Sequence, residues 1–321
     1  MRLALLTDAL EDRSQEDAFA WCAERGIAGV ELGVGGYSPA PHLDLAALLA
    51  SEAERERLTE TLEEHGLELV ALNASGNPLH PDPAIARDHD RALRGALELA
   101  AALDVRRIVA MSGCPGGPGS GGWPVFAGGA WLPDMEGLWD HQWENAIAPY
   151  WRELSAWAHE AAAGVDICLE LHPGTSIYNA ASFDLLSEAT GDNVKVNLDP
   201  SHFWWQGIDP VTTVRALGDR IRFVHGKDTI VYPDRVALQG VLDFRWPADA
   251  DTMPWHFCAV GHGRPLDEWR ELFDALSEAG YDGPVSIEQE DPTLSPEQGI
   301  EASLEGLRAV MEATVPGQPE R

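Results

Sequence analysis

Four residues in the second half of the sequence have the types and spacing to bind a metal ion together. They are three acids and one histidine: Glu170, Asp199, His225 and Glu288. Each lies at the end of a short apolar run, in DICLELH (166–172), VKVNLD (194–199), IRFVHG (221–226) and PVSIEQ (284–289). Three carboxylates can share a small space of low dielectric only if their pKa values rise or a cation lies among them. The set therefore predicts a divalent-metal site.

The ligand types indicate which ion to expect. Three carboxylate oxygens and one imidazole nitrogen form a mixed, fairly hard site, for which we expect one Mn²⁺, while Mg²⁺, Co²⁺ and Zn²⁺ also suit it. Taken singly, an acid at a strand end is more often a helix cap or a surface group, and a histidine is more often a core residue. The recurrence of such residues at four successive strand ends is what favours metal binding.

The alternation of side chains along a strand decides where these groups point. In 166–172 the aliphatic residues share one face, while Cys168, Glu170 and His172 share the other. Aliphatic side chains suit contact with helices, so we expect the polar set to face the inside of the sheet. The same parity directs Glu31 and Asn73 inward, and both are candidates for binding substrate hydroxyls.

The elements that position these residues alternate between strands and helices. The four remaining strand candidates are RLALLT (2–7), AGVELG (28–33), LELVALN (67–73) and RRIVAMS (106–112), and helical periods cover 84–103 and 265–279 among others. Eight strand–helix units predict an α/β fold, a (β/α)8 TIM barrel. An open doubly wound sheet is the rival, but TDALED (7–12) lacks its glycine-rich turn. We expect one domain over 1–314 and a flexible tail over 315–321.

Two long segments follow strand ends, at 113–135 and 226–264. In a barrel both would lie at the carboxyl-terminal face, where active sites are built. Disordered linkers are the alternative. Tryptophans and other apolar residues within the two segments favour ordered lids.

The composition excludes several classes of partner. The 321 residues carry 53 acidic and 22 basic side chains, a formal charge of −31, which predicts repulsion of nucleic acid and anionic membranes. The first residues turn acidic at Asp8, too early for a signal peptide, and no apolar run approaches the length of a membrane span. Four widely spaced cysteines without a CxxC pair predict a reduced, cytoplasmic setting.

The strand-end motifs resemble those of a known family. LELHPG (169–174), NLDPSH (197–202), VHGKD (224–228), SIEQE (286–290) and GVELG (29–33) resemble the xylose isomerase-like TIM barrels, which include sugar epimerases and inosose dehydratases. The resemblance implies that Glu170, Asp199, His225 and Glu288 hold one catalytic divalent ion. It also implies that Glu170 and Glu288 are the acid/base pair, that His202 contacts substrate or a further metal, and that the protein forms dimers or tetramers.

Further residues are candidates for contact with substrate. His172 would bind substrate or support a metal ligand, unless it is a capping or core histidine. Lys227 would bind an oxyanion, unless it forms a plain ion pair. Among the twelve tryptophans, Trp123 and Trp204 would offer flat faces to a sugar, unless they fill the lid and the core.

These observations predict a metal-dependent isomerase or epimerase that acts through a metal-stabilised enediolate. The sequence has no basic cluster for a phosphate, so we expect a non-phosphorylated sugar, keto-sugar or cyclitol as substrate. The alternative is a lyase or dehydratase acting on a keto-sugar or 3-keto-glycoside, because the same site serves β-elimination. A DNA-repair endonuclease would need more histidines on the early strands and a cationic face. A barrel that only binds a sugar is disfavoured by the two glutamates.

Overall fold

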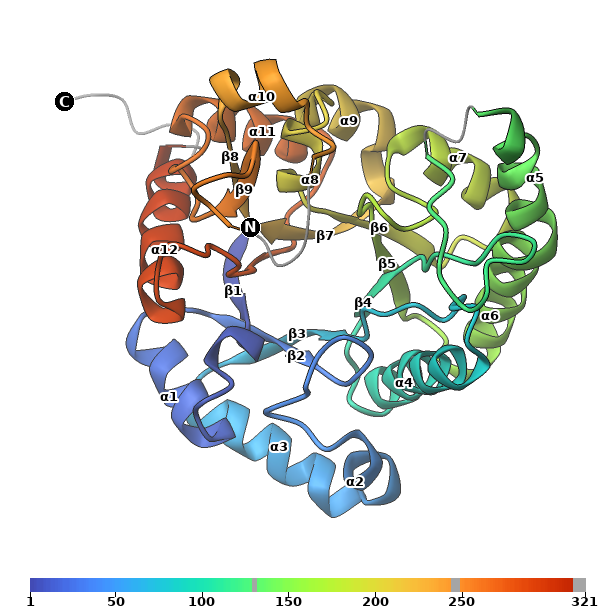
Figure 1. Ribbon diagram of the computed structural model, residues 1–321. Helices are drawn as coiled ribbons and strands as arrows, with labels where there is room; N and C mark the ends of the chain where they lie inside the picture. The colour runs from blue at the N-terminus through green and yellow to red at the C-terminus, as the bar shows by residue number, and fades with distance from the viewer. Residues whose placement is uncertain (129–131, 244–248, 314–321) are drawn as a thin grey trace.

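The computed structural model describes residues 1–128, 132–243 and 249–313. Eight parallel strands close into a barrel in the order β1-β10-β7-β6-β5-β4-β3-β2 (Figure 1). They are β1 (Arg2–Leu6), β2 (Gly29–Gly33), β3 (Glu68–Asn73), β4 (Arg107–Met111), β5 (Asp166–Glu170), β6 (Val194–Leu198), β7 (Ile221–Gly226) and β10 (Pro284–Ile287). The fold is the predicted (β/α)8 TIM barrel, and all eight predicted strands are confirmed.

Helices surround the barrel (Figure 1). The longer ones are α1 (Gln15–Glu24), α3 (Glu52–Glu64), α4 (Pro83–Ala102), α6 (Ala148–Ala161), α7 (Ala180–Ala189), α9 (Pro210–Leu217), α11 (Leu266–Glu278) and α12 (Pro296–Ala313). The shorter ones are α2 (Leu45–Ala50), α5 (Leu138–Gln142), α8 (Ser201–Trp204) and α10 (Pro233–Gln239), with 3-10 or π turns η1 (Thr7–Leu10), η2 (Pro133–Met135), η3 (Trp143–Ile147) and η4 (Gly218–Arg220).

Local sequence explains where these helices begin and which face they bury. The Asp82 side chain accepts a hydrogen bond from the Ala84 amide, and Pro83 occupies the first turn of α4, where a missing N–H costs nothing. On α11 the buried side chains include Trp269, Leu272 and Leu276, which recur at helical spacing. Both helices follow the predicted periods at 84–103 and 265–279.

The two faces of the barrel strands have different neighbours. Outward residues such as Ile167 and Val196 belong to the large core shared with the helices. Ala4, Val109, Cys168 and Phe223 form a separate small cluster inside the barrel. Cys168 and Phe223 lie two residues before Glu170 and His225, so this apolar layer lies directly beneath the polar side chains at the mouth.

The long segment after β7 is folded over its described residues, 226–243 and 249–264. It contains an antiparallel pair that the sequence did not reveal, β8 (Asp228–Val231) and β9 (Trp255–Cys258), with α10 between them. Asp228 Oδ2 accepts hydrogen bonds from the Gly261 and Arg264 amides and from Trp269 Nε1, at 2.8, 3.1 and 3.1 Å. The lid interpretation therefore holds for the described part of 226–264, and a disordered linker is wrong there.

The described part of the segment after β4 is held together by its own hydrogen bonds. Gln142 Nε2 donates to the Val125 carbonyl at 2.7 Å, and the Val125 amide donates to the Pro115 carbonyl at 2.9 Å. No helix in the described ranges is long and apolar enough to cross a membrane. The predicted tail, 315–321, lies outside the described residues, and the single domain over 1–314 stays a prediction.

Candidate metal centre and active site

The four predicted metal ligands meet at the carboxyl end of the barrel. One ligand atom from each of Glu170, Asp199, His225 and Glu288 lies within 4.8 Å of those from the others. Their strands are consecutive in the barrel, β5, β6, β7 and β10, and the register pairs Ser286 with His225 and Glu170 with Asn197. The first three side chains are buried, while that of Glu288 is 15% exposed. The donor set and its compactness fit a divalent ion.

The ring of His225 lies between two sets of acids. Its Nδ1 lies 3.3 Å from Glu170 Oε2 and 3.1 Å from Glu288 Oε2, while its Nε2 lies 3.2 Å from Glu31 Oε2. Burial alone would lower the pKa of His225, but the charges of Glu31 and Glu288 and its hydrogen bonds raise that pKa well above its usual value. Nδ1 is therefore the nitrogen that faces the predicted ligands.

The structure places Glu31 and Asn73 behind this histidine. Asn73 Nδ2 donates to Glu31 Oε1 at 2.7 Å, so an amide, a carboxylate and an imidazole form one chain. Both side chains point inward, as strand parity predicted. Their predicted contact with substrate stays untested, whereas their contacts here orient His225, a predicted metal ligand.

Lys227 brings a positive charge into the same cluster. Its side chain is 2% exposed, and Nζ lies 3.1 Å from Asp199 Oδ2, 2.5 Å from Glu288 Oε2 and 2.8 Å from Glu290 Oε2. Burial would lower the pKa of Lys227, but these acids raise it well above its usual value. Lys227 therefore carries an ammonium that neutralises two of the predicted metal ligands.

Two histidines lie on the other side of Glu170. His202 Nε2 lies 2.8 Å from Glu170 Oε1 and 3.4 Å from Asp199 Oδ2. The rings of His172 and His202 lie 4.1 Å apart, and burial together with His202 lowers the pKa of His172 to about 4. Glu170, His172 and His202 form a second group of ligand atoms within 4.8 Å, which shares Glu170 with the first.

The fold and this site can be matched to known proteins. A family model described as xylose isomerase-like TIM barrel matches residues 19–310. The chain belongs to this family. Among the relatives of this xylose isomerase-like barrel, the uncharacterized protein YfiH of Bacillus subtilis (strain 168) is 38% identical over 311 residues, which span 96% of this chain and 98% of YfiH.

More distant relatives of this xylose isomerase-like protein include enzymes. The inosose dehydratase of Lacticaseibacillus casei is 30% identical over 155 residues, which span 48% of this chain and 49% of the dehydratase. The structure of the IolI protein with a bound zinc atom has a TM-score of 0.65 and 20% identity, covering 99% of this chain and 100% of IolI. Solved sugar epimerases share the fold at similarly low identity.

The aromatic residues of this xylose isomerase-like barrel divide between the mouth and its surroundings. Trp204 packs edge-on against Trp269 of α11, with ring centroids 5.1 Å apart, and Trp123 is 77% exposed on its loop. Sugar contact by either stays a prediction. Phe257 of β9, which sequence reasoning missed, lies edge-on to His202 at 5.2 Å and 4.5 Å from Lys227 Nζ. The alternation of residue types in WHFC (255–258) could have indicated a strand that contains Phe257. Nothing in the sequence indicated that this strand lies over the mouth of the barrel.

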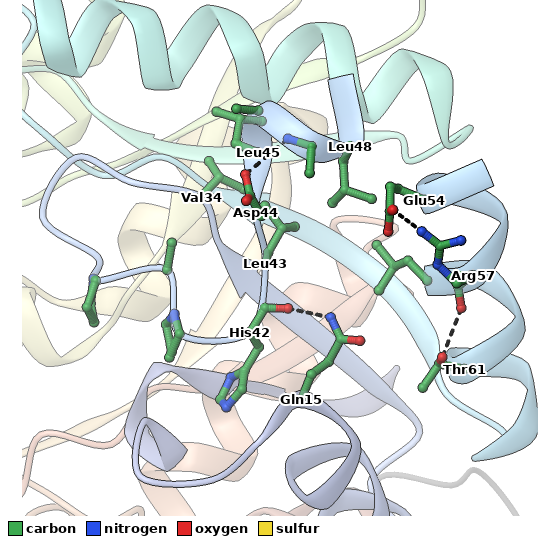
Figure 2. Close-up of a pocket in the computed structure, with 16 residues that line it drawn as sticks. Gln15, Val34, His42, Leu43, Asp44, Leu45, Leu48, Glu54, Arg57 and Thr61 are labelled. Atoms are coloured by element: carbon green, nitrogen blue, oxygen red, sulfur yellow. Dashed lines mark hydrogen bonds and ion pairs between the residues drawn. The ribbon is translucent and has the colours of Figure 1, made fainter. Parts of the chain in front are cut away.

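A pocket of about 810 Å³ has none of these site residues in its lining. Figure 2 shows the residues that line it. It is lined by the loop after β2 and by α2 and α3, and includes Gln15, His42 and Asp44. Its charged and polar groups pair with one another: Gln15 Nε2 donates to the His42 carbonyl at 2.5 Å, and Arg57 pairs with Glu54. It holds neither of the two groups of metal-ligating side chains found in the described residues, so the barrel mouth is the candidate active site.

Proposed function

We propose that the protein is a divalent-metal-dependent isomerase or epimerase of a non-phosphorylated keto-sugar, sugar or cyclitol. The observation that carries this proposal is the meeting of two glutamates, Glu170 and Glu288, within one compact group of metal-ligating atoms. Glu170 ends β5 and Glu288 directly follows β10, and these two strands are separated in the barrel by β6 and β7. They can therefore approach a substrate from different sides.

The metal would be held by Glu170, Asp199, His225 and Glu288. It would supply Lewis-acid stabilisation of negative charge that develops on a substrate oxygen. Mn²⁺ is the ion we expect from the oxygen-rich donor set, and the zinc in the IolI structure supports a divalent ion in this fold.

The residues of the chain would perform the proton transfers. One glutamate would remove the proton from the carbon beside the carbonyl. The same glutamate, or the other one if it starts protonated, would return a proton to the resulting enediolate. Return to the opposite face of the same carbon gives the epimer, and return to the neighbouring carbon gives the isomer. Lys227 and His202, both buried beside these carboxylates, would hold substrate oxygens in place.

A second candidate function is a dehydratase or lyase on a keto-sugar or 3-keto-glycoside. The similarity to an inosose dehydratase over about half of each chain supports it. The same proton abstraction, followed by loss of a β-oxygen, gives elimination. With either function we expect a cytoplasmic enzyme without nucleic-acid partners that forms dimers or tetramers.

Incubation with ketohexoses and inososes in D₂O with Mn²⁺ tests the proposal. Deuterium at the carbon beside the carbonyl, with an inverted centre or a moved carbonyl and no loss of water, would support an isomerase or epimerase. Formation of an unsaturated or deoxy product would favour the second candidate. Glu288→Gln should abolish either reaction, while Glu188→Gln on the exposed face of α7 serves as the matched control. Absence of any metal-dependent turnover across the panel would refute both.

A further inference from the structure

A cavity adjoins the metal-ligand cluster on the other half of the barrel mouth. It measures about 350 Å³, and its lining includes Asp8, Ser38, Asn73, Ser75, Met111 and Glu288. Apart from Glu288, these residues follow or end β1, β2, β3 and β4, the four strands that supply no predicted metal ligand. Because Glu288 belongs to both places, a substrate that reacts beside Glu288 extends naturally into this cavity.

Two buried polar atoms in the lining have no hydrogen-bond partner. They are Asp8 Oδ1 and Ser75 Oγ, and the Ser75 residue is only 9% exposed. Most buried polar atoms in proteins are paired, so two unpaired ones on a single cavity indicate a ligand that supplies their partners. A carboxylate oxygen accepts a hydrogen bond and a serine hydroxyl both donates and accepts, so hydroxyl groups can pair with both atoms.

The loop after β2 is shaped to close over this cavity. A Cβ at Gly33 would lie 2.5 Å from Asp8 Oδ1 and would also collide with Ser38. Gly36 has a φ of +76°, and a Cβ there would lie 2.3 Å from the Ser75 carbonyl oxygen. These two glycines let the backbone approach both Asp8 and Ser75 closely. The cavity is therefore a built feature of the fold.

The charge of the lining limits what can bind. The described residues around the cavity include the acids Asp8, Glu288 and Glu290 and no lysine, arginine or histidine. Burial, together with the charges of Glu31 and Glu288, raises the pKa of Asp8 to about 6. A phosphate or carboxylate would meet repulsion here, whereas a neutral hydroxyl would not.

We infer that Asp8 and Ser75 bind a substrate hydroxyl remote from the reacting carbons, and so determine which polyol the enzyme accepts. This inference rests on the proposed function. It adds a polyhydroxylated, uncharged distal half to the description of the substrate, and it assigns the recognition of that half to residues outside the metal-ligand set.

The test compares Asp8→Ala, Asp8→Asn and Ser75→Ala with wild type, and uses Asp12→Asn on the exposed surface as the matched control. Kinetics are measured on inososes, D-fructose and D-tagatose and on their singly deoxygenated analogues, with Mn²⁺. Loss of a hydrogen bond to a buried charged group predicts a rise in KM of about tenfold or more in Asp8→Ala, with a small change in kcat. The preference of wild type for one hydroxylated substrate over its deoxy analogue should fall by a similar factor.

Calorimetric titration with myo-inositol separates this inference from the proposed function. Weaker binding of myo-inositol to Mn²⁺-loaded Asp8→Ala than to wild type, with unchanged Mn²⁺ affinity, would support the inference even if no compound is turned over. Equal binding by the two proteins, no binding by wild type, or unchanged substrate preference in Asp8→Ala would overturn it. Failure of wild type to convert any compound in the panel would count against the proposed function alone.

Discussion

Oε2 of Glu31 lies 3.2 Å from Nε2 of His225, on the side of the ring opposite the predicted metal ligands. The two residues are 194 positions apart, and they meet because the closed barrel directs the side chains of β2 and β7 to its centre. A carboxylate that accepts from a metal-bound histidine fixes the orientation and the tautomer of the ring. Glu31 is therefore placed to orient His225, one of the predicted metal ligands.

Replacing Glu31 with glutamine tests this relationship. Glu31→Gln keeps the volume of the side chain but removes the charge that favours a proton on Nε2, so we expect Mn²⁺ affinity to fall about 10- to 100-fold. Calorimetric titration of the metal-free protein with Mn²⁺ measures the change. Glu64→Gln, at the exposed end of α3, should leave the affinity unaltered. An Mn²⁺ affinity equal to that of wild type would show that Glu31 does not support the site.

Lys227 provides the second prediction, because its ammonium pairs with Asp199 and Glu288, two of the predicted metal ligands. In metal-free protein, Lys227→Met leaves Asp199 and Glu288 without this partner, so the free energy of unfolding should fall by about 3 kcal/mol. The same change removes a competitor of the metal, so Mn²⁺ should raise the melting temperature more in Lys227→Met than in wild type.

Denaturation in urea with EDTA and with Mn²⁺ measures both effects. Lys227→Arg, which keeps the charge, is the control and should lose less stability without metal. A Lys227→Met protein that is as stable as wild type in EDTA would contradict the account of Lys227 as the cation of the metal-free cluster.

The sequence predicted the barrel because buried parallel strands appear as short apolar runs, and parity then placed Glu170 and His225 inward. It did not predict how residues on non-adjacent strands pair. Parity pointed Glu31 inward, but its contact with His225 depends on barrel closure and on a shift of register at Val30/Glu31. These are properties of the assembled sheet and leave no local pattern.

The loops held most of what the sequence could not predict. Phe257 reaches the mouth only because β8 and β9 pair as a hairpin above it, and Asp8 faces a cavity only because the loop after β2 folds over it. Trp204, predicted to offer a flat face to a sugar, packs edge-on against Trp269, a contact that the sequence did not predict, and its contact with substrate stays a prediction. Loop geometry depends on tertiary contacts more than on local propensity.

The pKa of Asp8 leads to a third prediction, on stability. Its folded-state pKa of about 6 exceeds the unfolded value of 3.8, so the protonated form favours the folded state. Below pH 3.8 Asp8 is protonated in both states and does not lower the free energy of unfolding. As the pH rises from 3.8 to about 6, Asp8 lowers the free energy of unfolding by an increasing amount, which reaches about 3 kcal/mol and then stays constant. Asp8→Asn removes this titration, so its stability relative to wild type should increase between pH 4 and 6.

Urea denaturation of the two proteins in EDTA across this pH range measures the difference. Asp12→Asn is exposed and should show a constant difference from wild type. If the difference between Asp8→Asn and wild type is also constant with pH, then Asp8 titrates normally and the crowding of acids around it is less than the geometry indicates.

Phe257 leads to the last prediction, which also tests which aromatic ring meets the substrate. Its ring lies 4.5 Å from Lys227 Nζ and edge-on to His202, so it holds both groups over the metal-ligand cluster. A desolvated cation–π contact is worth about 2 kcal/mol, so Phe257→Leu, which keeps an apolar side chain but loses the ring, should raise KM about 30-fold. Trp123→Leu removes an exposed ring, and KM should rise with it only if the loop after β4 closes on the sugar. Steady-state kinetics on the best keto-substrate compare the two variants. If KM rises for Trp123→Leu and not for Phe257→Leu, the ring that contacts the sugar is Trp123 on the loop after β4, and the prediction for Phe257 on β9 is wrong.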